Sequence, residues 1–338
     1  MSFTENKFDL DNIKTLHMET SSVCNAVCPG CPRELNILFD KELHATSLSL
    51  EKTKELFSPE FIKRLTLMYM CGHFGDPAAA PDTIDIFKYF QEHNNKCKLG
   101  IVSNGSLRNE KWWAELGDTL KQSDEHYAEF SIDGLSDTNH IYRKNTDFNK
   151  IIKNAIAFIN EGGNAQWVML VFKHNQHQVE EARLLAKELG FTSFVKKISR
   201  RFNVFKSDGI EPPDEYYNLY PDLPINNNTI VRKMPYPITT PIYTQPIDIK
   251  CQAIKEKSLA VTADGIIIPC GFVYRGPVFD PRLKKLLNSY NFQDLANTWE
   301  TDSPYFLCES VCNTKGTHVQ NMKFFNRQKT EITKFTDK

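Results

Sequence analysis

The chain contains 338 residues, of which 41% are hydrophobic and 25% are charged, and its formal net charge at pH 7 is -1. These proportions are those of an ordinary globular protein, and they exclude extensive disorder and fibrous repeats. The balanced charge excludes a global basic field for holding nucleic acid, although it is compatible with a local patch. At about 150 residues per domain, the length predicts roughly two domains.

The sequence predicts neither a membrane span nor a secreted protein. No apolar run approaches the roughly 18 residues that a membrane span needs. The stretch Met1–Asp11 is polar and charged, unlike a secretory signal. We therefore expect a cytoplasmic location, where the nine cysteines are more suited to metal binding or catalysis than to disulfides.

The first 200 residues alternate short β-rich runs with amphipathic segments. The runs predict strands at Thr15–Thr20, Leu65–Met70, Leu99–Ser103, Glu129–Ile132, Gln166–Phe172 and Phe194–Ile198. The segments between them predict helices at Leu50–Leu56, Ile84–Gln91, Glu110–Leu120, Asn149–Asn160 and Gln178–Leu189. Six β-α repeats predict an α/β fold, in which right-handed crossovers curl a parallel sheet into a complete or partial TIM-like barrel.

The residues with distinctive chemistry follow the predicted strands. They lie at Cys24–Arg33, Cys71–Pro77, Ser103–Gly105, Asp133-Gly134 and Lys173–Asn175. In a parallel barrel these positions meet at the carboxyl ends of the strands, which is where such folds carry their active sites. A merely structural sheet would not require this coincidence, so the pattern predicts a site at that edge.

The remainder of the chain differs in composition. Eight of the 17 prolines fall between Pro212 and Pro246, which predicts irregular or extended backbone over residues 201–250. A second unit is expected from Cys251 to residue 318, and the turn pair Asp264-Gly265 predicts a β-hairpin with a type I′ turn. Phe292–Thr301 is expected to be a short helix, and the polar tail 319–338 is expected to be a surface helix or a frayed end.

Cys24, Cys28 and Cys31 form the pattern C-x3-C-x2-C in the loop after the first predicted strand. Soft thiolates select zinc or iron–sulfur clusters. Structural zinc prefers four ligands, and only His17 and His44 offer a fourth within reach of a folded loop. A four-iron cluster held by three cysteines instead keeps one iron open for an exogenous chelating ligand.

The triad resembles the signature of the radical SAM superfamily, and the wider sequence Cys-Asn-Ala-Val-Cys-Pro-Gly-Cys-Pro-Arg resembles the members that carry an extra cluster domain. The resemblance implies a partial (β/α)6 barrel at 13–200, a 4Fe-4S cluster on the triad and S-adenosylmethionine (SAM) on the open iron. In that family, reductive cleavage of SAM yields a 5′-deoxyadenosyl radical that abstracts a hydrogen from the substrate. Many members carry an aromatic residue where this chain has Gly30, so no residue is assigned to the adenine.

Three further motifs match the family in order. Gly75 and Asp76 stand where the family has Gly-Gly-Glu-Pro, with Phe74 and Asp76 as departures, and this motif contacts the SAM amino group largely through its backbone. The resemblance further places Ser103 and Asn104 beside the ribose and brings Ser131 and Arg143 to the SAM carboxylate. Taken singly, Asn-Gly, Asp-Gly and Gly-Asp-Pro are usually turns.

A second cysteine set comprises Cys251, Cys270, Cys308 and Cys312. Four thiolates can complete an iron–sulfur cluster with no open iron. The spacing around Gly265 resembles the start of the SPASM/Twitch auxiliary-cluster domain, and the single set of four matches the shorter Twitch form with one second 4Fe-4S cluster. The last two cysteines, Cys308 and Cys312, are separated by three residues rather than the commoner two. The alternative to a cluster is a zinc ion held by the four thiolates.

Cys71 and Cys97 lie outside both sets. Cys97 is expected to be a small buried residue, whereas Cys71 is a candidate hydrogen or proton donor to a substrate radical, with core packing as the alternative. Lys196, Lys197 and Arg200-Arg201 could face the barrel mouth or form a solvated surface.

The resemblance predicts hydrogen abstraction from a peptide or small molecule, as in dehydrogenation, cross-linking or epimerisation, with a reductant such as flavodoxin or ferredoxin as partner. The auxiliary cluster could carry an electron, ligate the substrate or stabilise its domain. Modification of a nucleoside or nucleic acid and a non-catalytic thiolate–metal protein are the alternatives.

Overall fold

The computed structural model describes residues 10–34, 44–198, 210–215, 248–270, 292–297, 299, 308, 312 and 330–335. Within these residues, nine strands form one sheet in the order β8-β7-β1-β2-β3-β4-β5-β6-β9. The strands are β1 Thr15–Met18, β2 Leu67–Met70, β3 Lys98–Ser103, β4 Tyr127–Ser131, β5 Ala165–Val171, β6 Ser193–Ile198, β7 Ser258–Val261, β8 Ile267–Ile268 and β9 Thr330–Lys334. The strands β1 to β6 are parallel neighbours in chain order, which confirms the predicted α/β architecture.

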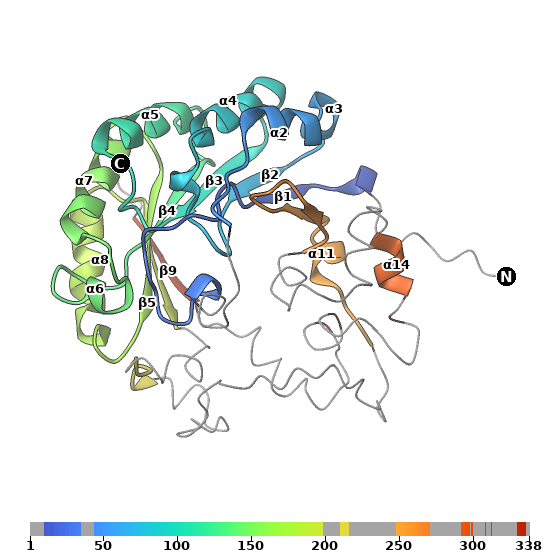
Figure 1. Cartoon of the computed structure of the whole chain (residues 1–338). Helices are drawn as coiled ribbons and strands as arrows, with labels where there is room; N and C mark the ends of the chain where they lie inside the picture. Colours follow the sequence, from blue (N-terminus) through green and yellow to red (C-terminus); the bar gives the residue numbers. More distant parts are fainter. Residues whose placement is uncertain are drawn as a thin grey trace.

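The helices between the parallel strands cover the convex face of the sheet (Figure 1). They are α2 Leu50–Leu56, α3 Pro59–Ile62, α4 Thr83–His93, α5 Glu110–Leu120, α6 Asn139–Tyr142, α7 Phe148–Asn160 and α8 Val179–Glu188. Two further helices, α11 Gln252–Lys255 and α14 Phe292–Asn297, follow β6 and β8 in the chain and lie outside this layer in Figure 1. Side chains cap several amino termini, since Ser49, Asn109 and Asp147 accept backbone N–H bonds at α2, α5 and α7.

The two faces of the sheet have different packing. On the helix side, Trp113 lies 4.8 Å from Phe130 between ring centroids, and Trp167 lies 5.4 Å from Phe191. These side chains are fully or almost fully buried and form the main core. Along β1, β2 and β4, buried residues alternate with half-buried ones, as expected for strands with one covered face and one face toward the concave interior.

The hairpin predicted after Cys251 is present, but its turn is not of type I′. Strand β7 pairs antiparallel with β8 and parallel with β1, so the hairpin extends the sheet of the core. A type I′ turn needs positive φ at both central residues, whereas only Gly265 has one, at +82°. The N–H of Gly265 donates to the carbonyl of Thr262, so the loop is a tight turn closed by a left-handed glycine rather than a two-residue turn.

The end of the chain contains a strand, which corrects the expectation of a surface helix or frayed end. Residues Thr330–Lys334 form β9, which pairs antiparallel with β6 at the far edge of the sheet. Its β-branched residues Thr330, Ile332 and Thr333 suit a strand, and the partner that stabilises it is distant in the sequence.

The domain boundaries and the full closure of the barrel stay predictions. Most of the proline-rich segment 201–250 lies outside the described residues, as do Arg200-Arg201 and the end of the helix expected at Phe292–Thr301. In the described part of the chain, no helix has the length and apolar character needed to cross a membrane.

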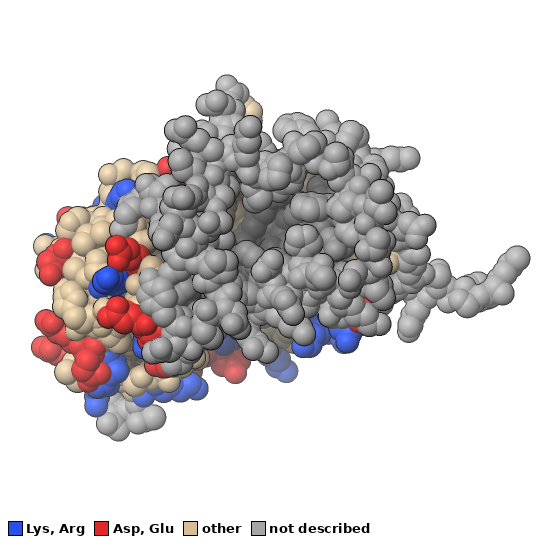
Figure 2. Space-filling view, turned by 90° about the horizontal axis from the view of Figure 1, so that it is seen from below, with Lys and Arg blue, Asp and Glu red and all other residues tan. Residues whose placement is uncertain are grey.

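Acidic and basic side chains are interspersed over the described part of the face in Figure 2. Opposite charges also pair on helices away from this face, as Lys88 does with Glu115 at 3.0 Å and Lys121 with Asp118 at 2.5 Å. On this face the described residues therefore form a mixed surface rather than a field of one sign.

Gly117 is required by the close approach of α5 and α7. A Cβ at this position would lie 2.4 Å from the backbone oxygen of Phe158. Gly117→Ala should gain about 1 kcal/mol in helix propensity but lose about 1–3 kcal/mol by overpacking. We therefore expect a net fall in the denaturant midpoint of unfolding. The control Lys111→Ala, on an exposed position of the same helix, should leave the midpoint nearly unchanged; a Gly117→Ala variant of higher stability would contradict this packing.

Candidate functional site

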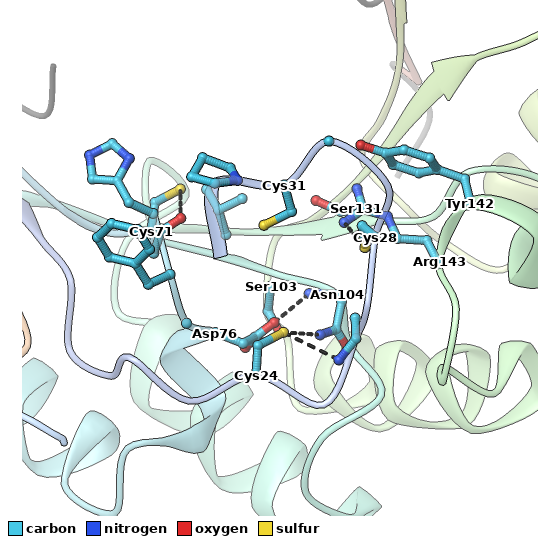
Figure 3. Close-up of a pocket in the computed structure, with 18 of the residues that line it drawn as sticks. Cys24, Cys28, Cys31, Cys71, Asp76, Ser103, Asn104, Ser131, Tyr142 and Arg143 are labelled. Atoms are coloured by element: carbon cyan, nitrogen blue, oxygen red, sulfur yellow. Dashed lines mark hydrogen bonds between the residues drawn. The ribbon is translucent and has the colours of Figure 1, made fainter. Parts of the chain in front are cut away.

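A cavity of about 330 Å³ lies at the carboxyl ends of the parallel strands. Every candidate residue that the sequence suggests in the core lines it: Cys24, Cys28, Cys31, Cys71, Gly75, Asp76, Ser103, Asn104, Ser131 and Arg143. The three thiols of the triad face a common space in Figure 3. The structure thus brings together residues from four strand ends, while the ligand of each stays a prediction.

The triad thiols are largely withdrawn from water. Burial raises the pKa of the Cys24 thiol to about 12 and that of Cys28 to about 11, although the guanidinium of Arg143 opposes the rise at Cys28. Neutral thiols are poor metal ligands, and a bound metal replaces the proton. Three thiols around one cavity, of which Cys28 is buried and Cys24 and Cys31 are half-buried, therefore form a donor set that fits a cationic iron–sulfur centre.

In the described residues, no group of three or more His, Cys, Asp or Glu side chains is arranged around a single metal ion. A four-iron cluster is bound at separate iron atoms, so its thiolates need not converge on one point. Neither His17 nor His44, the possible fourth ligands of a zinc site, lines the cavity. His17 is instead stacked on Tyr69 with a centroid distance of 4.7 Å.

The carboxylate of Asp76 forms hydrogen bonds within the chain. It accepts hydrogen bonds from the Ser103 hydroxyl at 2.8 Å, from the Asn104 N–H at 2.8 Å and from the Ala78 N–H at 2.9 Å. The residue is 4% exposed, and its pKa is raised by burial while these bonds oppose the rise. Asp76 thus holds the loop after β2 against the end of β3, and Gly75 of the same loop lines the cavity.

Asn104 connects the end of β3 to the cysteine loop. Its amide nitrogen donates to the Cys24 sulfur at 3.6 Å and to the Asn25 side-chain oxygen at 3.0 Å. The amide nitrogen of Asn25 donates in turn to the Ser106 hydroxyl at 2.6 Å. This chain of polar contacts fixes the position of Cys24, the first thiol of the triad.

Arg143 joins the end of β4 to the second thiol. Its Nε donates to Asp133 at 2.6 Å, and its Nη1 lies 3.8 Å from the Cys28 sulfur. Asp133 is completely buried, whereas the Arg143 side chain is 17% exposed and lies on the cavity wall. Ser131, from the same strand end, also lines the cavity.

Glu19 is an important residue that the sequence did not reveal. It follows β1, is 2% exposed, and accepts hydrogen bonds from the N–H of Phe74 at 2.6 Å and of Gly75 at 3.3 Å. Its own N–H donates to the carbonyl of Val261 in the hairpin. A single glutamate after a strand is unremarkable in sequence, so only its burial identifies it.

Arg33 and Tyr142 are also absent from the sequence-based assignment of the site. The guanidinium of Arg33 donates to the carbonyls of Ser22 and Phe74, and so ties the cysteine loop to the loop after β2. Tyr142 lines the cavity as a buried aromatic side chain. It supplies an aromatic wall that Gly30 cannot, and the motif that includes the neighbouring Arg143 does not itself specify an aromatic residue at 142.

The second cysteine set also gathers in space. Burial raises the pKa of Cys308, and the neighbouring thiols of Cys270, Cys251 and Cys312 raise it further. The N–H of Lys250 donates to the carbonyl of Cys312 at 2.9 Å, which joins the two ends of the set. Four nearby thiols fit an iron–sulfur cluster with four protein ligands.

The remaining cysteines and the lysines of β6 have the following contacts. Cys71 lines the cavity, and its carbonyl lies 2.5 Å from His17 Nε2, while Cys97 is fully buried in the core. Lys197 pairs with Glu129 at 3.3 Å, and Lys196 pairs with Glu215 and Glu331. The described lysines of this cluster are therefore ion-paired rather than freely solvated.

Solved structures share this fold. Streptococcus suis SuiB bound to precursor peptide SuiA has a TM-score of 0.52 and 14% identity, over 88% of this chain and 77% of that one. SuiB bound to S-adenosylmethionine has a TM-score of 0.52 and 13% identity, and the match covers 88% of this chain and 78% of that one. Histidine-tagged anSMEcpe with bound AdoMet has a TM-score of 0.50 and 16% identity, and the match covers 83% of this chain and 77% of that one.

SuiB and anSMEcpe are radical SAM enzymes of the SPASM/Twitch kind, and this chain shares their α/β fold with its parallel sheet. The resemblance found in the sequence is thus confirmed at the level of the fold. No family model and no curated protein matches the sequence.

The raised pKa of Glu19 predicts a dependence of stability on pH. Burial raises this pKa from 4.5 to about 7, so between these values the folded chain holds a proton that the unfolded chain has released. Stability should fall as pH rises through this window, by about 2 kcal/mol between pH 5.5 and 7.5. Glu19→Gln should remove that fall, as measured by denaturant unfolding. The exposed control Glu55→Gln should keep the wild-type profile, and parallel profiles for wild type and Glu19→Gln would refute the assignment.

Proposed function

We propose that this protein is a radical SAM enzyme in which Cys24, Cys28 and Cys31 hold a 4Fe-4S cluster and the cavity binds S-adenosylmethionine. The observation that carries the proposal is that the three thiols and three further motifs line one cavity. A chain with incidental cysteines would not need the ends of β2, β3 and β4 to meet the triad. The fold shared with SuiB and anSMEcpe supports the same conclusion.

The cofactors, when bound, supply a 5′-deoxyadenosyl radical able to abstract a hydrogen atom. The protein residues bind and orient them. Gly75 offers its backbone to the SAM amino group, and Arg143 offers N–H donors to the SAM carboxylate, a task that suits its planar fork. Ser131, Ser103 and Asn104 complete this wall, the latter two by holding the loops in place.

We further propose that the substrate is a peptide or a small molecule. SuiB is bound to its precursor peptide in a structure with this fold, which supports a peptide. Cys71, on the cavity wall, is the proposed donor of a hydrogen atom or proton to the substrate. Dehydrogenation, cross-linking and epimerisation are all compatible with this arrangement.

The proposal includes an auxiliary 4Fe-4S cluster on Cys251, Cys270, Cys308 and Cys312, and a reductant such as flavodoxin or ferredoxin in a cytoplasmic setting. The proximity of Cys251, Cys270 and Cys312 to Cys308 supports the cluster. The mixed charge on the face in Figure 2 gives no support to the nucleic-acid alternative.

The triad is tested by Cys28→Ala. With dithionite and SAM, the anaerobically purified wild type should form 5′-deoxyadenosine, and the variant should form none because the cluster loses a ligand. Cys97→Ala is the matched control, since it removes a buried thiol outside both sets and should retain the activity. Product formation by Cys28→Ala, measured by chromatography, would remove the triad from the mechanism. A colourless wild-type protein containing one or two zinc ions would instead support the thiolate–metal alternative.

The auxiliary set is tested by Cys270→Ala. The wild type should contain about eight irons per chain, as two clusters of four. The variant should contain about four irons and keep the SAM-dependent spectral change of the first cluster. Iron analysis and electron paramagnetic resonance measure these two properties. An iron content equal to that of the wild type would reject Cys270 as a ligand.

A further inference from the structure

The pair of Asp133 and Arg143 is held in place by several hydrogen bonds. Asp133 accepts from Leu170 N–H through one oxygen and from Arg143 Nε through the other, both at 2.6 Å. The backbone of Asp133 is also fixed, because Asn139 accepts from its N–H and Asn175 donates to its carbonyl. Both amide residues are fully buried.

The guanidinium is aimed at a sulfur atom. Arg143 Nη1 lies 3.8 Å from the Cys28 sulfur, and Cζ lies 5.5 Å from the centre of the Tyr142 ring. Asp133 and Tyr142 therefore confine the side chain between a carboxylate and a proposed cluster ligand. The ion pair is a fixed dipole, and its positive end touches Cys28.

A positive charge and an N–H donor at a ligating sulfur stabilise the extra electron of a reduced cluster. Hydrogen bonds to the sulfurs and local charge are among the main influences that a protein has on the potential of such clusters. Here the guanidinium contacts the sulfur through Nη1, whereas the carboxylate contacts the guanidinium at Nε, so the favourable effect of Arg143 outweighs the opposite effect of Asp133. Lys197, which also lies near Asp133, is paired with Glu129, and the opposite charges of these two side chains largely cancel.

We propose that Arg143, positioned by Asp133, raises the reduction potential of the cluster that Cys28 holds. The inference rests on the proposed function and adds a role that is present before SAM binds. The two roles of Arg143 are compatible, because a guanidinium has five N–H donors and the contacts with Asp133 and Cys28 leave others for a carboxylate.

The test is the midpoint potential of Arg143→Gln without SAM. The relevant cluster is identified in the wild type, as the one whose electron paramagnetic resonance signal changes when SAM is added afterwards, and its signal is then followed in the variant. At a fixed potential, the ratio of reduced to oxidised cluster should fall about tenfold, equivalent to a midpoint about 59 mV more negative. If Arg143 served only the SAM carboxylate, the midpoint without SAM would equal that of the wild type, and the inference would be wrong.

Arg183→Gln is the matched control. It removes the same charge from a partly exposed arginine of α8 that pairs with Glu180, and its midpoint should equal that of the wild type. An equal shift in this variant would assign the effect to overall charge and overturn the inference.

A second variant covers the case in which Arg143→Gln leaves Asp133 unpaired and prevents folding. The double variant Arg143→Gln with Asp133→Asn removes both buried charges. It should shift the midpoint in the same direction by a smaller amount, whereas a wild-type midpoint would overturn the inference. If the wild type contained no iron, or formed no 5′-deoxyadenosine, the proposed function would be rejected. If variants that contain the cluster had the wild-type midpoint potential, this inference alone would be rejected.

Discussion

The site depends on the backbone contact between the segment that follows β1 and the loop that follows β2. The N–H of Cys71 donates to Met18, and the N–H of Asp76 donates to Val23, at 3.0 and 2.8 Å. Between these bonds, a Cβ on Gly75 would lie 1.9 Å from the Ser21 oxygen. No side chain fits there, so the two segments lie in direct backbone contact and the cysteine loop starts from a fixed direction.

Buried polar side chains complete this arrangement and limit what each can do for a ligand. Burying a carboxylate is costly unless hydrogen bonds replace its water. Asp76, Asp133 and Glu19 each receive at least two such bonds from loops or strand ends that border the cavity. Their carboxylates therefore act as supports, while thiols, backbone groups and the Arg143 guanidinium are presented to the cavity.

The repeating pattern of the sequence predicted the parallel sheet because each strand and helix carries its own local periodicity. The order of the motifs predicted the cavity because parallel strands end at one edge. Three features lay beyond this reasoning. Glu19 lacks a motif, β9 depends on pairing with the distant β6, and the turn at Gly265 depends on a bond from its N–H to Thr262 that the Asp-Gly pair alone does not specify.

The attachment of the hairpin bears on the relation between the two cysteine sets. Strand β7 is paired along its whole length with β1, and the N–H of Glu19 donates to Val261 at its end. The same glutamate accepts from Phe74 and Gly75 on the cavity side. Because Cys270 closely follows β8, its position is tied through this ladder to the strand that leads into Cys24. The loops that carry Cys24 and Cys270 therefore extend from one continuous sheet, in which β1 pairs with β7 and β7 pairs with β8.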